Sequence, residues 1–374
     1  MTHNLTPDML SAFGRDVEEL HLSVKADLGE ADVRYIRRVM KAQRALGVLG
    51  RGLLFAGFFP PTWVAGTVCL SLSKIIENME VGHNVMHGQY DFSRAKELDS
   101  QTYEWDHLCP GDQWRHSHNY MHHTYTNVRG VDHDLGYRML RVTDEQPWHP
   151  GYLLQPLYAA WLALSFQLGV GLHDVDVRRF IFQKRKDRDP EEARKLREIA
   201  KKAARQALPD YVLFPLLAGP HAPAVFAGNL LANLVRNVWS FTVIFCGHFP
   251  EGTATFDPAC LENESRAHFY LRQLLGSANF EGGRVTHFLS GHLSHQIEHH
   301  MFPDIPAYRY PAMSKKLRVI CAKYGVPYNT GSLAKQFASV VKKIFRLALP
   351  ASRAGSAGEE ADTLRAELHE ACRP

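Results

Sequence analysis

The sequence lacks several features that would place it in common classes of protein. No apolar run extends unbroken for the roughly 20 residues that cross a bilayer comfortably, because the apolar stretches are short or uneven. The six cysteines form no CxxC pair and no paired framework, which is typical of a reducing compartment. A net charge of only +4 does not indicate nucleic-acid binding. Residues 1–43 contain no apolar segment of the kind that defines a secretory signal peptide.

The residue type that stands out is histidine, which is concentrated in three short windows. Ten of the 21 histidines lie in residues 83–87, 116–123 and 292–300, which together make up only 22 of the 374 residues. Each window contains two histidines four residues apart, and on a helix such a pair shares one face. Histidine is the commonest metal ligand in proteins. The windows therefore predict a site for two metal ions, or for one ion with several bystander histidines.

Two pairs of apolar segments predict helical hairpins that enter a membrane. The first pair is Ala45–Phe59 and Thr62–Ser73, separated by a double proline that breaks the helix. The second pair lies within Tyr211–Gly247 and turns at residues 219–223, which include two prolines and a glycine. We therefore expect an all-α integral membrane helical protein with two membrane-entering hairpins and a cytoplasmic histidine-rich cap.

The distribution of positive charge indicates how this protein is oriented. The two hairpin tips carry no lysine or arginine, whereas Asp174–Pro209 holds twelve basic residues. The positive-inside rule then places both termini, the basic segment and the histidine windows on the cytoplasmic side. The apolar stretch Gly151–Leu172 is expected to lie in the interface, since a crossing there would move the basic segment outside. We expect a cytoplasmic segment over 1–44, a membrane domain over 45–349 and a poorly ordered tail over 350–374.

The ligand set narrows the choice of metal. Structural zinc sites are closed by four ligands and usually include cysteine, and calcium and magnesium prefer oxygen ligands. Copper is chemically compatible, but we expect iron with open positions for dioxygen, because a redox metal beside lipid can oxidise an unactivated C–H bond. A carboxylate-bridged site is the alternative, since Glu80-His83 and Glu104-His107 have the Glu-x-x-His spacing. It would leave the other histidine windows without a purpose.

The order and content of the three windows carry a family resemblance, extending over roughly Ile75 to Tyr310. The patterns are Gly82-His-Asn-Val-Met-His87-Gly, Trp114-Arg-His-Ser-His-Asn-Tyr-Met-His-His-Thr-Tyr-Thr-Asn127 and Gly291-His-Leu-Ser-His-Gln-Ile-Glu-His-His-Met-Phe-Pro303. They resemble the three histidine boxes of the membrane fatty acid desaturases, and most closely those of bacterial acyl-lipid or acyl-CoA desaturases. The resemblance implies a di-iron, O2-dependent enzyme that removes two hydrogens from a fatty acyl chain to form a cis double bond.

The same resemblance implies which residues bind the metal. The ligands carried over from the boxes are His83, His87, His118, His122, His123, His299 and His300. The remaining position of the third box is occupied by His in some members and by Gln in others. We therefore predict His295 as the ligand, with Gln296 as the rival. His248, in Phe-Cys-Gly-His-Phe-Pro at the end of the second hairpin, resembles an additional histidine ligand of the family.

Metal-bound imidazoles need partners that accept their other N–H group and so orient the ring. The residues that we consider for positions around the ligands are His116, Glu80, Asp91, Asp132, Asp134, His292, Gln296 and Glu298. For Asp132 and Asp134 a capping role is equally compatible with the sequence. Trp105 and Trp114 are interpreted as anchors at the membrane interface, with walls of an acyl channel as the alternative.

The expected partners are a membrane, a fatty acyl lipid or acyl-CoA, and a separate electron donor. The chain has no Gly-x-Gly-x-x-Gly fingerprint and no cysteine set for an iron–sulfur cluster. It also lacks the His-Pro-Gly-Gly sequence seen in fused cytochrome b5 domains. A ferredoxin, a cytochrome b5 or a flavin reductase would therefore supply the electrons. The alternatives are a related membrane hydroxylase or ketolase, and a non-enzymatic metal-binding membrane protein.

Overall fold

A computed structural model describes residues 5–182 and 189–350, and these residues form helices with one short pair of strands. The all-α expectation is thus confirmed for the described part of the chain. The strands β1 (Asn279–Glu281) and β2 (Thr330–Ser332) are parallel and pair Phe280 with Gly331. Residues 351–374, nearly all of the expected tail, lie outside the described residues.

The segments of the first expected hairpin lie in two helices that pack against each other, α2 (Glu30–Phe55) and α3 (Pro60–Ile76). A Cβ atom on Gly50 would lie only 2.8 Å from the backbone nitrogen of Leu70, so the small residue permits this close approach. The two prolines open α3, where a missing N–H group has no cost. Because α2 already begins at Glu30, the expected boundary at residue 44 falls inside this helix.

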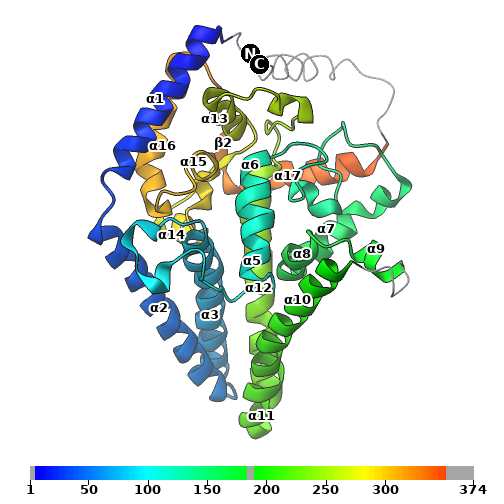
Figure 1. Ribbon diagram of the computed structural model, residues 1–374. Helices are drawn as coiled ribbons and strands as arrows, with labels where there is room; N and C mark the ends of the chain where they lie inside the picture. The colour runs from blue at the N-terminus through cyan, green and yellow to red at the C-terminus, as the bar shows by residue number, and fades with distance from the viewer. Residues whose placement is uncertain (1–4, 183–188, 351–374) are drawn as a thin grey trace.

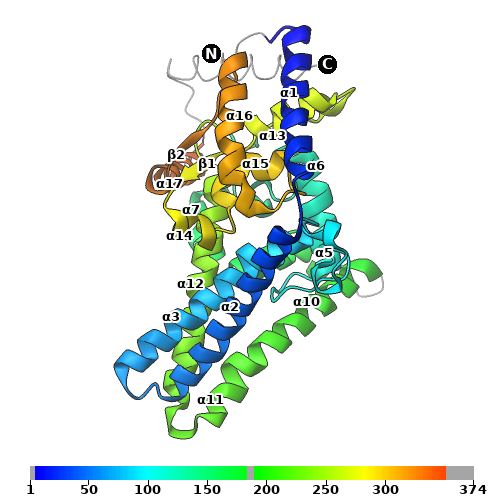
Figure 2. The same ribbon diagram turned by 90° about the vertical axis from the view of Figure 1, so that its left-hand side faces the viewer.

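The second expected hairpin, Tyr211–Gly247, is also covered by helical segments. The turn η8 (Pro209–Leu213) and α11 (Phe214–Leu217) precede its tip, and α12 (Ala222–His248) follows it. The helix α10 (Pro190–Leu208), which lies in the basic segment, leads directly into η8. Gly219 turns the chain with a φ of +56°, a conformation that favours glycine. Figures 1 and 2 show α11 and the tip of the first hairpin at the same end of the molecule.

Only two segments of the described chain are long and apolar enough to be candidate membrane spans. Gly219–His248 is long and apolar enough to cross a membrane, and Pro150–Leu164 with Phe166–Leu172 would count as a second span despite a 99° bend. This bent pair comprises the 3-10 turn η6 (Pro150–Leu154), α7 (Gln155–Leu164) and α8 (Phe166–Leu172).

The opposite end of the molecule is a cap of shorter helices (Figure 1). Here α1 (Pro7–Lys25) packs against α13 (Arg266–Leu275) and α16 (Tyr310–Tyr324) around a buried apolar core. The amphipathic helix α17 (Leu333–Ala348) packs against α7 and α12.

The remaining short helices complete the chain. Five are α-helical: α4 (Asn84–Met86), α5 (Gly111–Trp114), α6 (His123–Tyr125), α9 (Val177–Phe182) and α14 (Arg284–Leu289). Turns of 3-10 helix occupy Asp91–Ser93, Lys96–Leu98, Leu135–Arg138, Gly219–His221, Pro258–Leu261 and Ala307–Arg309.

Candidate metal centre

The three histidine windows sit on helix ends that meet where the cap joins the long helices. The first window follows α3 through a π-helical turn, η1 (Glu77–His83), into α4. The second occupies another π-helical turn, η4 (Arg115–His122), between α5 and α6. The third spans η11 (Leu293–His295) and α15 (Gln296–Met301). Wide π-helical turns occur frequently at functional sites, where they change the direction of the side chains.

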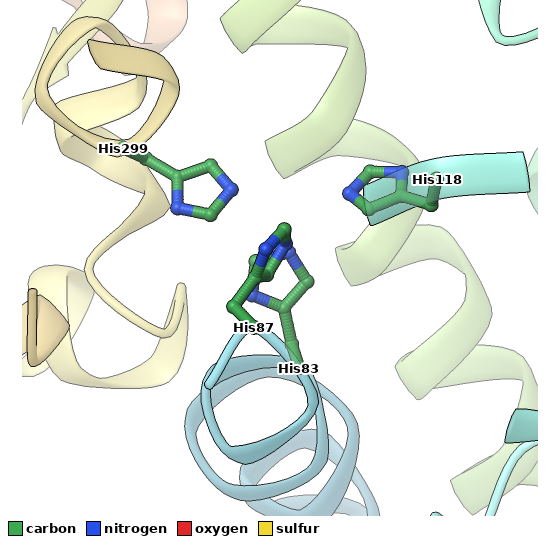
Figure 3. A group of neighbouring side chains, drawn as sticks. All are labelled: His83, His87, His118 and His299. Atoms are coloured by element: carbon green, nitrogen blue, oxygen red, sulfur yellow. The ribbon is translucent and has the colours of Figure 1, made fainter. Parts of the chain in front are cut away.

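Eight imidazoles converge at this junction, in groups whose nitrogen atoms lie within 4.8 Å of one another. Three of the groups contain histidines alone: His83, His87, His118 and His299; His122, His248 and His300; and His123, His299 and His300. A fourth group joins His118 and His122 to Asp134. Figure 3 shows the first group, in which His83 and His87 rise from one helix end and His118 and His299 face them from two sides. The prediction that segments distant in sequence gather around one site is confirmed.

Most of these rings present a buried nitrogen that no described residue satisfies. The Nε2 atoms of His83, His87, His118, His122 and His299, both ring nitrogens of His123, and Nδ1 of His248 have no hydrogen-bond partner among the residues described. A buried polar atom without a partner costs about 1–3 kcal/mol. Such a concentration of unpaired imidazole nitrogens fits metal ligands and has no purpose in a purely structural core.

Carboxylates on the far side of the rings hold the nitrogens in place. His118 donates from Nδ1 to Asp134 and His122 donates from Nδ1 to Asp132, each over 2.9 Å. Nδ1 of His300 lies 3.2 Å from the amide oxygen of Gln273. A proton fixed on Nδ1 leaves the lone pair on Nε2 directed into the centre, as a metal ligand requires. Asp132 and Asp134 thus accept hydrogen bonds from two of the converging imidazoles, as the orienting role among their predicted roles would require.

Protonation also favours ligation for most of the rings. Burial holds the pKa of His123, His299 and His300 well below the usual value, so these imidazoles are neutral at pH 7. His122 is the exception, because Asp132 and Asp134 outweigh its burial and raise its pKa to about 9. Burial alone would raise the pKa of Asp134, but the neighbouring His173 and His122 hold it well below the usual value.

The third window requires a correction. His295 contacts His287, with 4.9 Å between ring centroids, and lies in none of the groups. The amide nitrogen of Gln296 instead lies 2.9 Å from Nε2 of His248. The reason is local: α15 begins at Gln296, so Gln296, His299 and His300 share one helical face, while His295 belongs to the preceding 3-10 turn.

Several residues expected around the ligands bond elsewhere. His116 is exposed at the surface. His292 lies 3.1 Å from Glu80, which also accepts a hydrogen bond from Tyr35. Asp91 accepts from Ser100, and Glu298 accepts from Tyr328 and Asn279. These side chains fix loops and helices around the centre and do not hold any of its eight imidazoles. The Glu-x-x-His alternative also loses support, because Glu104 pairs with Lys202.

The two tryptophans are not interface anchors. Trp105 is 5% exposed and Trp114 is 2% exposed, and both line a cavity of ≈ 50 Å³ that also borders His83 and His118. Trp114 stacks on His118 at a centroid distance of 4.5 Å. The alternative interpretation, a wall of an acyl channel, is the one that agrees with this placement.

Sequence reasoning missed His173, which lines the same cavity, and it considered His107, another lining residue, only in the Glu-x-x-His alternative. His173 lies 2.7 Å from Asp134 and therefore shares this carboxylate with His118. The sequence signal that could have identified His173 is its position directly after the apolar stretch Gly151–Leu172, beside Asp174.

A helical fold with one or two helices long and apolar enough to span a membrane, together with a buried polyhistidine cluster, is the class of protein that this geometry defines. The chain belongs to the fatty acid desaturase family, whose model matches residues 61–332. The family expectation is confirmed, and the protein is a fatty acid desaturase, an oxidoreductase of lipid metabolism.

Named relatives agree with this assignment. The chain is 44% identical over 362 residues to an NADPH-dependent stearoyl-CoA 9-desaturase of Mycobacterium tuberculosis, covering 96% of this chain and 83% of the relative. It is 28% identical to an sn-1 linoleoyl-lipid 6-desaturase of Synechocystis, covering 74% and 78%. It is 30% identical to a chloroplastic acyl-lipid (7-3)-desaturase of Chlamydomonas reinhardtii, covering 58% and 43%. These similarities favour a desaturase over a hydroxylase, a ketolase or a metal transporter.

Proposed function

We propose that this desaturase binds two iron ions and uses O2 to introduce a cis double bond into the acyl chain of an acyl-CoA at the cytoplasmic face of a membrane. The observation that carries the proposal is the convergence of eight imidazoles, most of which have an unpaired buried nitrogen. A single metal ion would leave several of these buried imidazole nitrogens without a partner.

The grouping of the rings supports two metal positions. His83, His87, His118 and His299 would hold one ion, and His122, His248 and His300 the other, with His123 between the two groups. Gln296, beside His248, takes the third-box position in place of His295. Iron bound here would supply the activation of dioxygen that abstraction of hydrogen from an unactivated methylene requires. Asp132 and Asp134 would keep His122 and His118 of the second window oriented toward the ions.

The cavity beside the centre suits a hydrocarbon chain. Trp105, Trp114, Phe166, Val170 and Ile244 contribute apolar walls next to His83 and His118. The position of the chain in such a channel decides which methylene lies at the metals, so regiochemistry follows from positioning. The M. tuberculosis relative is named for stearoyl-CoA and position 9. By that likeness we take a long-chain acyl-CoA as substrate and position 9 as the site of the double bond.

A separate reductase completes the reaction. The same relative is NADPH-dependent, and this chain has no dinucleotide fingerprint of its own. A flavin reductase, a ferredoxin or a cytochrome b5 would therefore dock near the histidine cap and supply electrons.

The membrane arrangement that we propose has both helical hairpins inserted with their tips in the bilayer and the cap in the cytoplasm. Large apolar side chains at the two tips support it: Phe58 is 70% exposed, Phe59 is 55%, Leu216 is 72% and Leu217 is 65%. Exposed apolar residues gathered at one end are expected to face lipid.

The test is expression of the full chain in a host that lacks 9-desaturase activity, with analysis of cellular lipids and of iron in the purified protein. The unsubstituted chain should produce a new 9-unsaturated acyl chain and retain about two iron ions, as the two ligand groups require. His299→Ala should abolish both, while His116→Ala, an exposed histidine of the second window, should retain both. Unsaturation that survives in His299→Ala would refute the proposed centre.

A further inference from the structure

Arg236 is a buried cation in the helix that is long and apolar enough to span a membrane. It lies near the middle of Gly219–His248 and is only 3% exposed. Its Nη2 atom donates to the amide oxygen of Asn237 over 3.2 Å, but its Nε atom has no partner in the described part of the chain. No carboxylate of residues 5–182 or 189–350 forms an ion pair with it within 4.0 Å. A charge inside a membrane segment is costly and therefore indicates a functional site.

The other buried arginines show how unusual this situation is. Arg272 forms two hydrogen bonds with Glu264, at 2.6 and 2.9 Å. Arg141 donates to the backbone carbonyl oxygens of Gln146, Asp144 and Leu347. Both guanidinium groups are thus satisfied by the protein itself, whereas that of Arg236 is satisfied only in part.

The nearby carboxylates are already engaged. Asp210 accepts from Arg51 over 2.8 Å and from Lys74 over 2.9 Å, so two cations share its single negative charge. Asp106 accepts from Gln206 over 2.8 Å. Asp106 and Asp210 both act on Arg236 from beyond ion-pair distance, but the three cations Arg51, Lys74 and Arg236 outnumber these two carboxylates, so an incoming anion could balance the remaining positive charge.

Arg236 lines a cavity of ≈ 300 Å³ whose walls come mainly from α8, α10, η8 and α12. Asn233 and Asn237 add polar groups beside it, and Asp210, which is paired with Arg51 and Lys74, also lines the cavity. Apolar walls come from Leu164, Leu168, Leu230 and Leu234. Gln167 borders both this cavity and the one beside the metal centre. One wall is thus suited to an anion and the other to hydrocarbon.

We propose that this cavity binds the anionic headgroup of an amphiphile, a carboxylate or a phosphate, through the Arg236 guanidinium, with the alkyl chain against the four leucines. A planar guanidinium with a free N–H suits bidentate bonding to either anion. The site is separate from the imidazole cluster, and the inference does not rest on iron binding or desaturation. Because Gln167 adjoins both cavities, the bound amphiphile would lie next to the reacting acyl chain.

The experiment measures binding by native mass spectrometry of the full-length protein in dodecyl maltoside. The probes are laurate, dodecyl phosphate, neutral dodecanol and inorganic phosphate. We expect one laurate or dodecyl phosphate per chain, with Arg236→Gln weakening the binding at least about tenfold, as loss of a charged hydrogen bond does. Arg236→Lys keeps the charge but loses the bidentate geometry, so its binding should lie between that of the unsubstituted chain and that of Arg236→Gln, and dodecanol should bind all three weakly.

Two further variants keep the test decisive if Arg236→Gln does not fold. Ala207→Phe, on the α10 wall, fills the cavity without changing the guanidinium and should also weaken anion binding. Arg129→Gln removes a partly exposed arginine elsewhere and should leave it unchanged. Equal binding in Arg236→Gln and the unsubstituted chain, or no anionic amphiphile bound at all, would overturn the site. Inorganic phosphate binding as tightly as dodecyl phosphate would overturn the assignment to an amphiphile.

Discussion

Two clusters of buried polar side chains lie in this molecule, and they are satisfied to very different degrees. Around Asp210, both carboxylate oxygens accept hydrogen bonds, from Arg51, Lys74 and Asn233. Among the eight converging imidazoles, most have a buried nitrogen without a partner in the described chain. The Asp210 carboxylate is fully paired by the protein alone, whereas the unpaired imidazole nitrogens would be satisfied only by metal ions that they bind.

The difference separates structural from functional polar groups. A satisfied cluster joins α2, α3 and η8 and contributes to the fold. An unsatisfied cluster costs folding free energy and persists because it provides a binding site. Substitutions in the two clusters should therefore have opposite effects on stability and on activity.

The largest effect on activity is expected for His123→Phe. Both ring nitrogens of His123 lack a described partner, and phenylalanine fills a similar volume without polar atoms. Activity should fall by more than about 100-fold. Loss of a residue that only orients a metal ligand typically costs about 10- to 100-fold in affinity or activity, and loss of a ligand should cost more. The metal-free protein should unfold at the same or a higher temperature, since the substitution removes a buried unpaired group. A variant that loses stability along with activity would remove the contrast between the clusters.

The opposite pattern is expected for Asp210→Asn. This change leaves Lys74 and Arg51 without a counter-charge, which typically costs about 3–5 kcal/mol of stability when such a pair is buried. Thermal unfolding in neutral detergent should report the loss, while iron per folded chain stays unchanged. Replacing Asp210, Lys74 and Arg51 together by apolar residues of similar volume should restore most of the stability. Loss of iron from the folded Asp210→Asn fraction would contradict the structural assignment.

A smaller effect is expected for Asp132→Asn and Asp134→Asn. Each carboxylate accepts the Nδ1 proton of one imidazole, and loss of such an orienting partner costs about 10- to 100-fold in metal affinity. The measurement is competition for iron against a chelator. Asp91→Asn is the matched control, because Asp91 bonds only Ser100 and should retain the original affinity. Equal losses in all three variants would mean that the carboxylates act through the fold.

Much of this fold follows from patterns within single segments. The double proline at the start of α3 and the Gly-Pro turn before α12 marked both helical pairs, because these residues interrupt or start helices by their own geometry. The start of α2 was missed, because its first half is charged and amphipathic and owes its place to packing against η1 and the cap. The bend between α7 and α8 is likewise a tertiary feature with no sharp local signal.

At the candidate metal centre, the sequence indicates which residues are candidate ligands but not how their side chains are oriented. Histidines spaced four apart indicate candidate metal ligands. The residues that hydrogen-bond to the outer nitrogen of each ring come from chain segments that meet only in the folded protein, so the sequence does not identify them. His173 reaches Asp134 from another element, and Trp105 is buried by surrounding helices. An aromatic residue beside an apolar run gives the same sequence signal whether it faces lipid or lines a cavity.

The smallest effects are expected for His295 and Gln296, the pair for which the prediction from the sequence differs from the structure. His295→Ala is expected to change activity less than about twofold, because His295 packs against His287 away from the centre, as most surface and loop changes outside a site do. Gln296→Ala should reduce activity by about tenfold, since its amide lies beside His248 and one hydrogen bond of this kind is worth about 1 kcal/mol or somewhat more. Rates for both variants at equal iron content distinguish the two residues. If His295→Ala were the more damaged variant, the helix start at Gln296 would not decide which side chain faces the metals, and the original choice of His295 would stand.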